Sequence, residues 1–138
     1  MAKQTPVLVK SFGADSGISS ANVCVVMSGA NPGNVALPGG ALATKFLGVA
    51  QEVIAPNAPA GQIGVIVEGI AQIQTDGSTP IVAGDYLVIA NAGGQVKSIS
   101  PASGATLRQI IGVALNSVTN SAGLLVDALI QPMVYFGA

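Results

Sequence analysis

Carboxylates are the main side chains in this sequence that could carry out chemistry. The chain has six Asp and Glu residues and five Lys and Arg residues, but no His. General acid–base catalysis near neutral pH usually depends on His, or on carboxylates and lysines with shifted pKa values. Glu68 and Asp127 occupy equivalent positions in an internal repeat, so pseudo-symmetry could bring them close, as a carboxylate pair requires. The interpretation that we favour is that both are single acids on strands and face solvent.

The other polar motifs are typical of turns. Asp76-Gly77-Ser78 has the wrong residue order for the Asp-Ser/Thr-Gly loop of an aspartic protease. Asp85 follows Gly84 and is expected to accept hydrogen bonds from backbone N–H groups of its turn. No Asp, Glu or Cys residues cluster with metal-ligand spacing, and Gly39-Gly40 lacks the Lys of a phosphate-binding loop. The sequence therefore predicts no catalytic, cofactor-binding or metal-binding residues, and a protein that is not an enzyme.

Cys24 is the one cysteine, so the chain cannot form an intramolecular disulfide. It lies in the apolar run Val23–Met27. A reactive thiol needs a cationic or His neighbour, and the chain has no His. We predict a buried, inert thiol.

Composition excludes several classes of protein. With 138 residues and 50% apolar residues, the chain is long enough for one domain and too hydrophobic to be disordered. Its mean hydropathy is +0.64, but apolar stretches such as 63–73 are interrupted by Glu68 and fall short of the about 20 residues of a spanning helix. A net charge of −1 and few aromatic residues do not give the basic footprint of a nucleic-acid-binding protein. We expect neither membrane nor nucleic acid as a partner.

Only 8% of the residues are charged, which is a solubility liability for a free monomer. One explanation is that the apolar residues are Ala and Val in strands. The explanation that we favour is that an assembly covers much of the surface.

An imperfect internal repeat is the most informative pattern in the chain. Phe46–Ala50 (FLGVA) is followed by Ile110–Ala114 (IIGVA), and Val67–Gln72 by Val126–Gln131. Each second segment carries one acid and a Gln four residues later. The repeat predicts two β-hairpin-like halves, whose glycines mark bends or close backbone approach.

Short runs rich in Val and Ile, bounded by Gly, Pro, Asn and Asp, predict an all-β fold of the small sandwich or barrel type. Asn91–Gly94 is a typical hairpin turn. Helical turns are expected only at 40–45 and 103–109. The predicted strands are 23–27, 47–53, 64–74, 86–90, 96–100, 110–117 and 124–134.

Residues 1–20 differ from the rest of the chain and predict an extended N-terminal arm, followed by a single β domain over residues 21–138. Arms of this kind are usually disordered unless they dock on a partner. The alternative is a first edge strand at Val7–Phe12.

The order of these motifs resembles that of the tailed-bacteriophage head decoration proteins, also called capsid cement or stabilisation proteins. The resemblance covers about residues 35–132 and includes Gly39-Gly40, both Gly-Val-Ala segments, Val65–Ala71 and Ala83–Val88. The family's pattern is a hydrophobic-Glu-Gly strand and a Gly-Asp-aromatic-hydrophobic strand between the two Gly-Val-Ala segments. Residues 20–45, which are longer and richer in Gly, Asn and Pro than that pattern, depart from it.

The resemblance implies a small β-barrel or β-tulip-like domain with short helical turns and an extended N-terminal arm. It further implies a homotrimer, made in the host bacterial cytoplasm, that binds the exterior of the expanded capsid and clamps neighbouring subunits of the major capsid protein. The arm would extend a capsid strand by β-augmentation. Tyr135 and Phe136 lie in a C-terminal segment, Pro132–Phe136, that extends beyond the family's pattern; we expect them either to contact the trimer or the capsid, or to belong to a last strand. The arm residues expected to contact the capsid are Lys3, Pro6, Val7, Leu8, Val9, Lys10 and Phe12.

Two alternatives stay open. Ala83–Val88 and a Gly-Gly hairpin also occur in small barrels that carry lipoyl or biotinyl groups, but those need a Lys at an exposed hairpin tip. Neither Asn91–Gly94 nor Asp76–Ser78 offers one, and Lys97 is expected inside a strand. The other alternative is a different phage structural subunit, such as a tail or fibre component.

Overall fold

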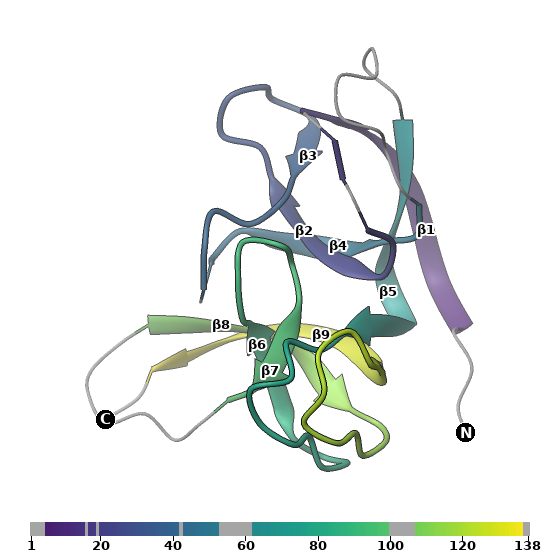
Figure 1. The fold of residues 1–138 in the computed structure, drawn as a ribbon. Helices are drawn as coiled ribbons and strands as arrows, with labels where there is room; N and C mark the ends of the chain where they lie inside the picture. Colours follow the sequence, from purple (N-terminus) through teal and green to yellow (C-terminus); the bar gives the residue numbers. More distant parts are fainter. Residues whose placement is uncertain are drawn as a thin grey trace.

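The described residues form one 9-stranded sheet that rolls into a barrel at one end (Figure 1). This computed structural model describes residues 5–15, 17, 18, 20–41, 43–52, 62–99 and 107–136, with the backbone only at residues 5, 6, 107, 108, 135 and 136. The strands are β1 (Thr5–Ala14), β2 (Val23–Met27), β3 (Asn34–Ala36), β4 (Phe46–Ala50), β5 (Gln62–Gln74), β6 (Tyr86–Ile89), β7 (Val96–Ser98), β8 (Leu107–Ala114) and β9 (Leu125–Phe136).

Strands β1 to β5 make a closed barrel. They are hydrogen-bonded in the order β1-β3-β2-β4-β5, and a further antiparallel pairing between β1 and β5 closes the ring. Closure leaves fewer free strand edges than an open sheet of the same size. The predicted all-β barrel fold is therefore confirmed.

The long strand β5 belongs to both parts of the molecule. Its first residues pair with β1 and β4, and its last residues, from Gly69 to Gln74, pair with β9. Beyond β5 the same sheet continues through β9, β8, β6 and β7, which are drawn below the barrel in Figure 1. We call these four strands, with the end of β5, the second sheet. A bridge between Thr75 and Val96 connects β7 back to the end of β5.

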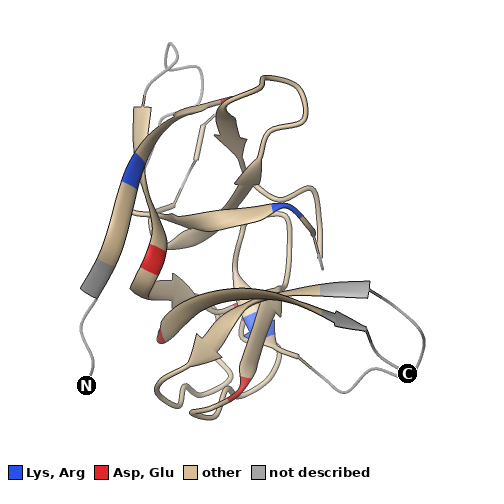
Figure 2. Cartoon of the chain, turned by 180° about the vertical axis from the view of Figure 1, so that it is seen from behind, with Lys and Arg blue, Asp and Glu red and all other residues tan. Residues whose placement is uncertain are grey.

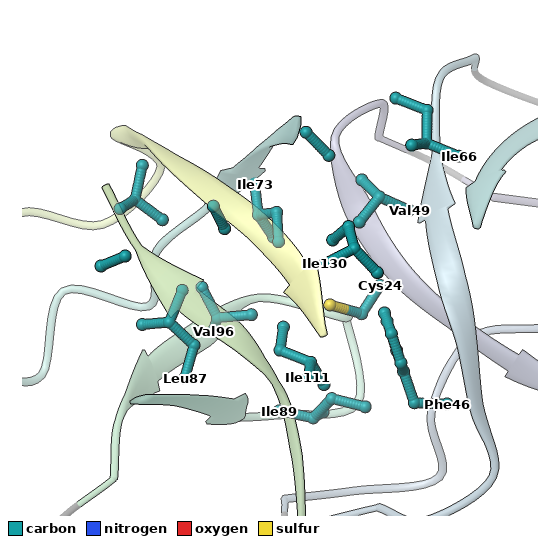
Figure 3. Packing of buried hydrophobic residues seen from close by; sticks show 14 of the residues in the cluster. Cys24, Phe46, Val49, Ile66, Ile73, Leu87, Ile89, Val96, Ile111 and Ile130 are labelled. Atoms are coloured by element: carbon teal, nitrogen blue, oxygen red, sulfur yellow. The ribbon is translucent and has the colours of Figure 1, made fainter. Parts of the chain in front are cut away.

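Two hydrophobic cores result from this arrangement. The smaller core fills the barrel and contains Val23, Val25 and Ile63 among others. The larger, central core lies between the wall of the barrel and the second sheet, and includes Cys24, Phe46, Ile73 and Ile111 (Figure 3). Successive side chains of a strand point to opposite faces. Strand β2 therefore supplies both cores, which explains why its sequence is apolar without alternation.

Gly69 lies where β5 passes from the barrel to the second sheet. Ile63 and Val65 face the barrel core, whereas Ala71 and Ile73, which are also odd-numbered, face the central core. Gly69 has a φ of 106°, a conformation that glycine adopts without steric cost. This backbone conformation changes which face of the strand meets which core.

The turn between β6 and β7 connects the two parts of the molecule. The predicted hairpin is confirmed, and the Asn91 side chain accepts a hydrogen bond from the backbone N–H of Gly93 at 3.0 Å. The backbone N–H of Cys24 in β2 donates to the carbonyl of Gly94 at 2.8 Å. A Cβ at Gly94 would collide with the Cys24 backbone, and its φ of 80° also favours glycine.

The repeat gives two hairpin-like pairs, β4 with β5 and β8 with β9, as predicted. In each pair the repeated glycine lies against a backbone carbonyl of the partner strand. A Cβ at Gly48 would be closer than 3.0 Å to the oxygen of Ile66, and one at Gly112 equally close to the oxygen of Leu129. The prediction of close backbone approach is therefore confirmed at both glycines.

Most strand predictions agree with the structure to within a few residues, but one strand was missed and the expected helical turns were not found among the described residues. Strand β3 (Asn34–Ala36) was missed because its three residues adjoin an Asn-Pro-Gly turn. Residues 40, 41 and 43–45 of the first expected helical turn are not helical, and residue 42 lies outside the described residues. In the second expected turn, 107–109 belong to β8, and residues 103–106 lie outside the described residues. The described part of the chain contains no helix, and therefore none of the length and apolarity needed to cross a membrane.

Candidate interaction surface

Residues 5–14 of the expected arm form strand β1, which is the edge-strand alternative. β1 pairs with β5 from Thr5 to Gly13, and with β3 only at Gly13 and Ala14. Among the described strands, residues 5–12 thus have a partner on one side. Their free side carries backbone N–H and C=O groups that another strand can pair with.

Three consecutive apolar residues of β1 are exposed. Val7 is 75%, Leu8 40% and Val9 43% accessible, and Lys10 is exposed as well. Phe12 differs, because it is half-buried and packs against the barrel core. Lys3 lies outside the described residues, and for Pro6 only the backbone is described.

Two features make the β1 edge irregular. Register shifts occur between Pro6 and Leu8 and between Leu8 and Val9. Pro6 has no backbone N–H, and Lys10 places a charge on the edge; both features discourage indiscriminate strand pairing. The edge is therefore open to a partner that accommodates this irregular register.

A polar cluster that the sequence reasoning missed holds the end of β1 to the β2–β3 loop. The Asp15 carboxylate accepts hydrogen bonds from the Ser28 hydroxyl, from Nδ2 of Asn31 at 2.9 Å and from Nδ2 of Asn34 at 3.1 Å. These bonds, led by that of Ser28, lower the pKa of Asp15 from its ordinary value of 3.8 although desolvation opposes them. We name these four residues the Asp15 cluster.

Glu68 and Asp127 are not a carboxylate pair. The two repeat segments run antiparallel, with Ile70 opposite Leu129 and Gln72 opposite Asp127. This symmetry places the acid of one copy beside the Gln of the other, and Gln72 Nε2 donates to Asp127 Oδ1 at 3.2 Å. Glu68 lies about 13 Å along β5 from Gln72 at the usual rise of a strand. The favoured interpretation, that the two acids do not pair, is therefore confirmed, but the expectation that both face solvent is wrong for Asp127.

The surroundings of the two acids also differ. Glu68 is exposed, as expected for a single acid on a strand. Asp127 is 1% accessible, and its Oδ2 atom has no hydrogen-bond partner within the described part of the chain. Its backbone N–H donates to the Asn116 side chain at 2.9 Å.

The remaining candidate residues have structural surroundings. Asp85 accepts from the Val82 N–H, and Asp76 accepts from the Ser78 N–H, both at 3.0 Å, so both turn predictions are confirmed. Cys24 is buried, and burial raises the pKa of its thiol. Lys97 lies within β7, as expected. Tyr135 and Phe136 are in β9, where their backbone pairs with Arg108 and Leu107; nothing is described of their side chains.

Charged residues are few and scattered over the described surface (Figure 2). No group of three or more Cys, Asp and Glu side chains within the described ranges could hold a metal ion. Among the described residues, the exposed features that stand out are the apolar side chains of β1 and the free edge of that strand. Both are means of binding other proteins.

Comparisons with known proteins give a similarity of fold. No protein-family model matches the chain, and no curated protein matches its sequence. A similar solved structure is the N base of the head fiber gp8.5 in bacteriophage phi29. The TM-score is 0.61 at 17% identity, over 90% of this chain and 95% of that one. At this identity the similarity shows a common fold.

Proposed function

We propose that this chain is a structural protein of a phage virion that binds the outer surface of the expanded capsid. The observation that carries the proposal is the fold, which this chain shares over 90% of its length with the base of a phage head fiber. The resemblance of its motif order to head decoration proteins supports the same class independently. In this role the protein stabilises the shell by clamping neighbouring subunits of the major capsid protein.

Strand β1 is the proposed capsid contact. Its free edge offers backbone hydrogen bonds to a capsid strand, and Val7, Leu8 and Val9 offer exposed apolar side chains. Main-chain pairing supplies affinity in β-augmentation, and side-chain pockets supply specificity. Many copies on one shell would multiply a modest affinity into lasting attachment.

Binding of this kind needs no reactive group and few charges. Interactions between exposed charges weaken as salt screens them, whereas apolar contacts do not. With 8% charged residues, capsid binding should therefore change little between low and high ionic strength. Release of most bound copies by salt would contradict a contact through β1.

The experiment is co-sedimentation of the purified protein with its cognate capsids, expanded and unexpanded, with the bound copies counted. We expect saturable binding to expanded shells, at a ratio that fits the capsid lattice. Val7→Asp should weaken binding strongly. Val82→Asp is the matched control, since Val82 is also an exposed valine, at 59%, but lies outside β1. Absence of binding to either shell would reject the proposal.

A fibre subunit is the second candidate, because the similar structure is itself named as part of a head fiber. A fibre base attaches at particular positions and carries a further, distal structure, whereas a decoration protein covers the lattice. Labelling this protein on intact particles separates the two. A regular lattice of label supports decoration, and a few discrete sites support a fibre.

A further inference from the structure

Strand β9 has a free edge of its own at its C-terminal end. It pairs with β5 only from Leu125 to Ile130, whereas its pairing with β8 continues as far as Phe136. Among the described strands, residues 131–136 thus have a partner on one side only. Figure 1 shows this end of β8 and β9 extending beyond β5 and β6 as two strands. We call residues 107–111 and 131–136 the β8–β9 ribbon.

The described side chains of β9 in this ribbon are uncharged and largely exposed. Gln131 and Pro132 are exposed, Met133 is half-buried, and Val134 is 68% accessible. Of the other described strands, only β1 has two successive exposed residues. Val7 in β1 and Val134 in β9 are also the two most exposed large apolar residues of the described chain. Exposed apolar side chains thus lie along a free strand edge at two places in the molecule.

The two free edges share features that limit strand pairing. Pro132 lies in β9 next to a register shift, which falls between Ile110 and Gly112 of the paired strand β8. The edge of β1 has the same combination of a proline and a register shift at Pro6. A proline has no backbone N–H to donate, and a bulged edge does not accept every strand. Like that of β1, the edge of β9 is therefore suited to a partner of matching register.

Strands β1 and β9 diverge from a common point on β5. Gly69 pairs with Pro6 of β1 on one side and with Ile130 of β9 on the other. Both pairings are antiparallel, so β1 and β9 run in the same direction from this point. β1 then follows β5 as far as Gly13, whereas β9 leaves β5 after Ile130. Figure 1 shows β1 and the β8–β9 ribbon on opposite sides of the molecule.

The β8 side of the ribbon is held by the barrel. The side-chain oxygen of Gln109 accepts a hydrogen bond from the backbone N–H of Phe46 at 2.9 Å, and Ile110 and Ile111 are buried. The free edge of the ribbon is therefore that of β9. Two strands alone are marginally stable in water, so a third strand added to this edge would stabilise the ribbon.

We propose that the free edge of β9 is a second capsid contact, which binds an extended segment of the major capsid protein subunit next to the one that β1 binds. This inference rests on the proposed function, because a protein that clamps two subunits needs two separate contacts. The capsid protein is favoured as the partner because the edge of β9 is continuous with the β1 contact across β5. Backbone pairing would supply affinity, and Val134 would fill a side-chain pocket.

The first test is to cross-link this edge to purified, expanded cognate capsids. Cys24 is the one cysteine of the chain and is buried, so Val134→Cys supplies one accessible thiol for a maleimide that carries a photoreactive benzophenone. We expect a product with the major capsid protein, at a segment different from that reached from Val7→Cys. Val82→Cys is the control, an exposed valine outside both edges, and should give little product. A product that joins two copies of this chain instead overturns the inference.

The second test is whether the two contacts act together. Loss of one contact from a bivalent attachment removes the advantage of a high effective concentration, so Val134→Asp should weaken binding to expanded capsids about a hundredfold. Val7→Asp should have a similar effect, and Val82→Asp none. Only proteins with both contacts should raise the temperature at which the shell disassembles, because a single contact cannot link two subunits. Light scattering on heating measures this temperature.

The outcomes separate this inference from the proposed function. Absence of capsid binding by the unmodified protein rejects both. Binding and shell stabilisation that depend on Val7 but not on Val134 overturn the inference and leave the proposed function in place. Circular dichroism checks that each variant is folded. If Val134→Asp does not fold, the cross-linking of Val134→Cys decides the question.

Discussion

The two copies of the repeat share a backbone arrangement and differ in what covers them. In β4–β5 and in β8–β9 a glycine lies against a carbonyl of the partner strand. β4 is the wall between the barrel and the central core, with Val49 facing one core and Ala50 the other. Only one face of β8 lies in a core. Val113, and Leu115 directly after the strand, are on the opposite face. The repeat thus encodes the close approach of two strands, and the rest of the chain decides whether both faces are covered.

The two ends of the β5–β9 pair show the same difference. One end holds Gln72 and Asp127, where the acid is buried. Glu68 and Gln131 follow directly after the last paired positions at the other end, and both are exposed. An acid with identical placement in the repeat is thus solvated in one copy and enclosed in the other.

The strongest test of the shared backbone arrangement is to add a methyl group to each repeated glycine. Gly48→Ala and Gly112→Ala should each lower the free energy of unfolding by about 3 kcal/mol or more, because a backbone carbonyl occupies the space of the new Cβ. Urea denaturation measures both. Gly39→Ala is the control, since nothing lies within 4 Å of a Cβ there. A large effect at one glycine and none at the other would break the equivalence of the copies.

The two copies of the repeat differ in how far their strand faces are covered by other strands. Substitutions at equivalent positions should therefore lower the free energy of unfolding by unequal amounts. Ile66 opposes Val49 as Leu129 opposes Val113, but Ile66 is 0% and Leu129 39% accessible. Ile66→Ala should cost about 2–5 kcal/mol of stability because it leaves a cavity in the core. Leu129→Ala should cost clearly less, because Leu129 is already partly exposed to solvent and its loss leaves no enclosed cavity. Equal costs would mean that the face of β9 that carries Leu129 is covered within the single chain.

Acid should weaken the barrel before it weakens the second sheet. The pKa of Asp15 is lowered in the folded protein, so its contribution to stability is complete above its ordinary value of 3.8 and is lost as the pH falls through the folded value. Hydrogen exchange in β1 and β3 should therefore speed up at low pH relative to exchange in β8 and β9. In the Asp15→Asn variant, the difference in exchange rate between these two pairs of strands should shrink. If the difference keeps its full size, a group other than Asp15 causes the acid sensitivity.

Local features of this protein were predictable from its sequence. The β-branched runs indicated where most strands lie, and Asp76, Asp85 and Asn91 acted as turn residues because their short polar side chains bond to backbone groups nearby in the chain. The repeat revealed the two glycines at close approach. The burial of Cys24 followed from its apolar neighbours in the sequence.

Other features depended on segments that are distant in sequence. The Asp15 cluster joins residues 13 to 19 positions apart, and β3 is a strand mainly because β1 and β2 lie on either side of it. The sequence by itself determined the all-β class, the turns and the paired glycines, because these follow from local backbone preferences. Only the tertiary structure decided that Glu68 is exposed to solvent while Asp127 is buried. The burial of a strand's face depends on which other strands pack against it, and a local pattern does not contain that information.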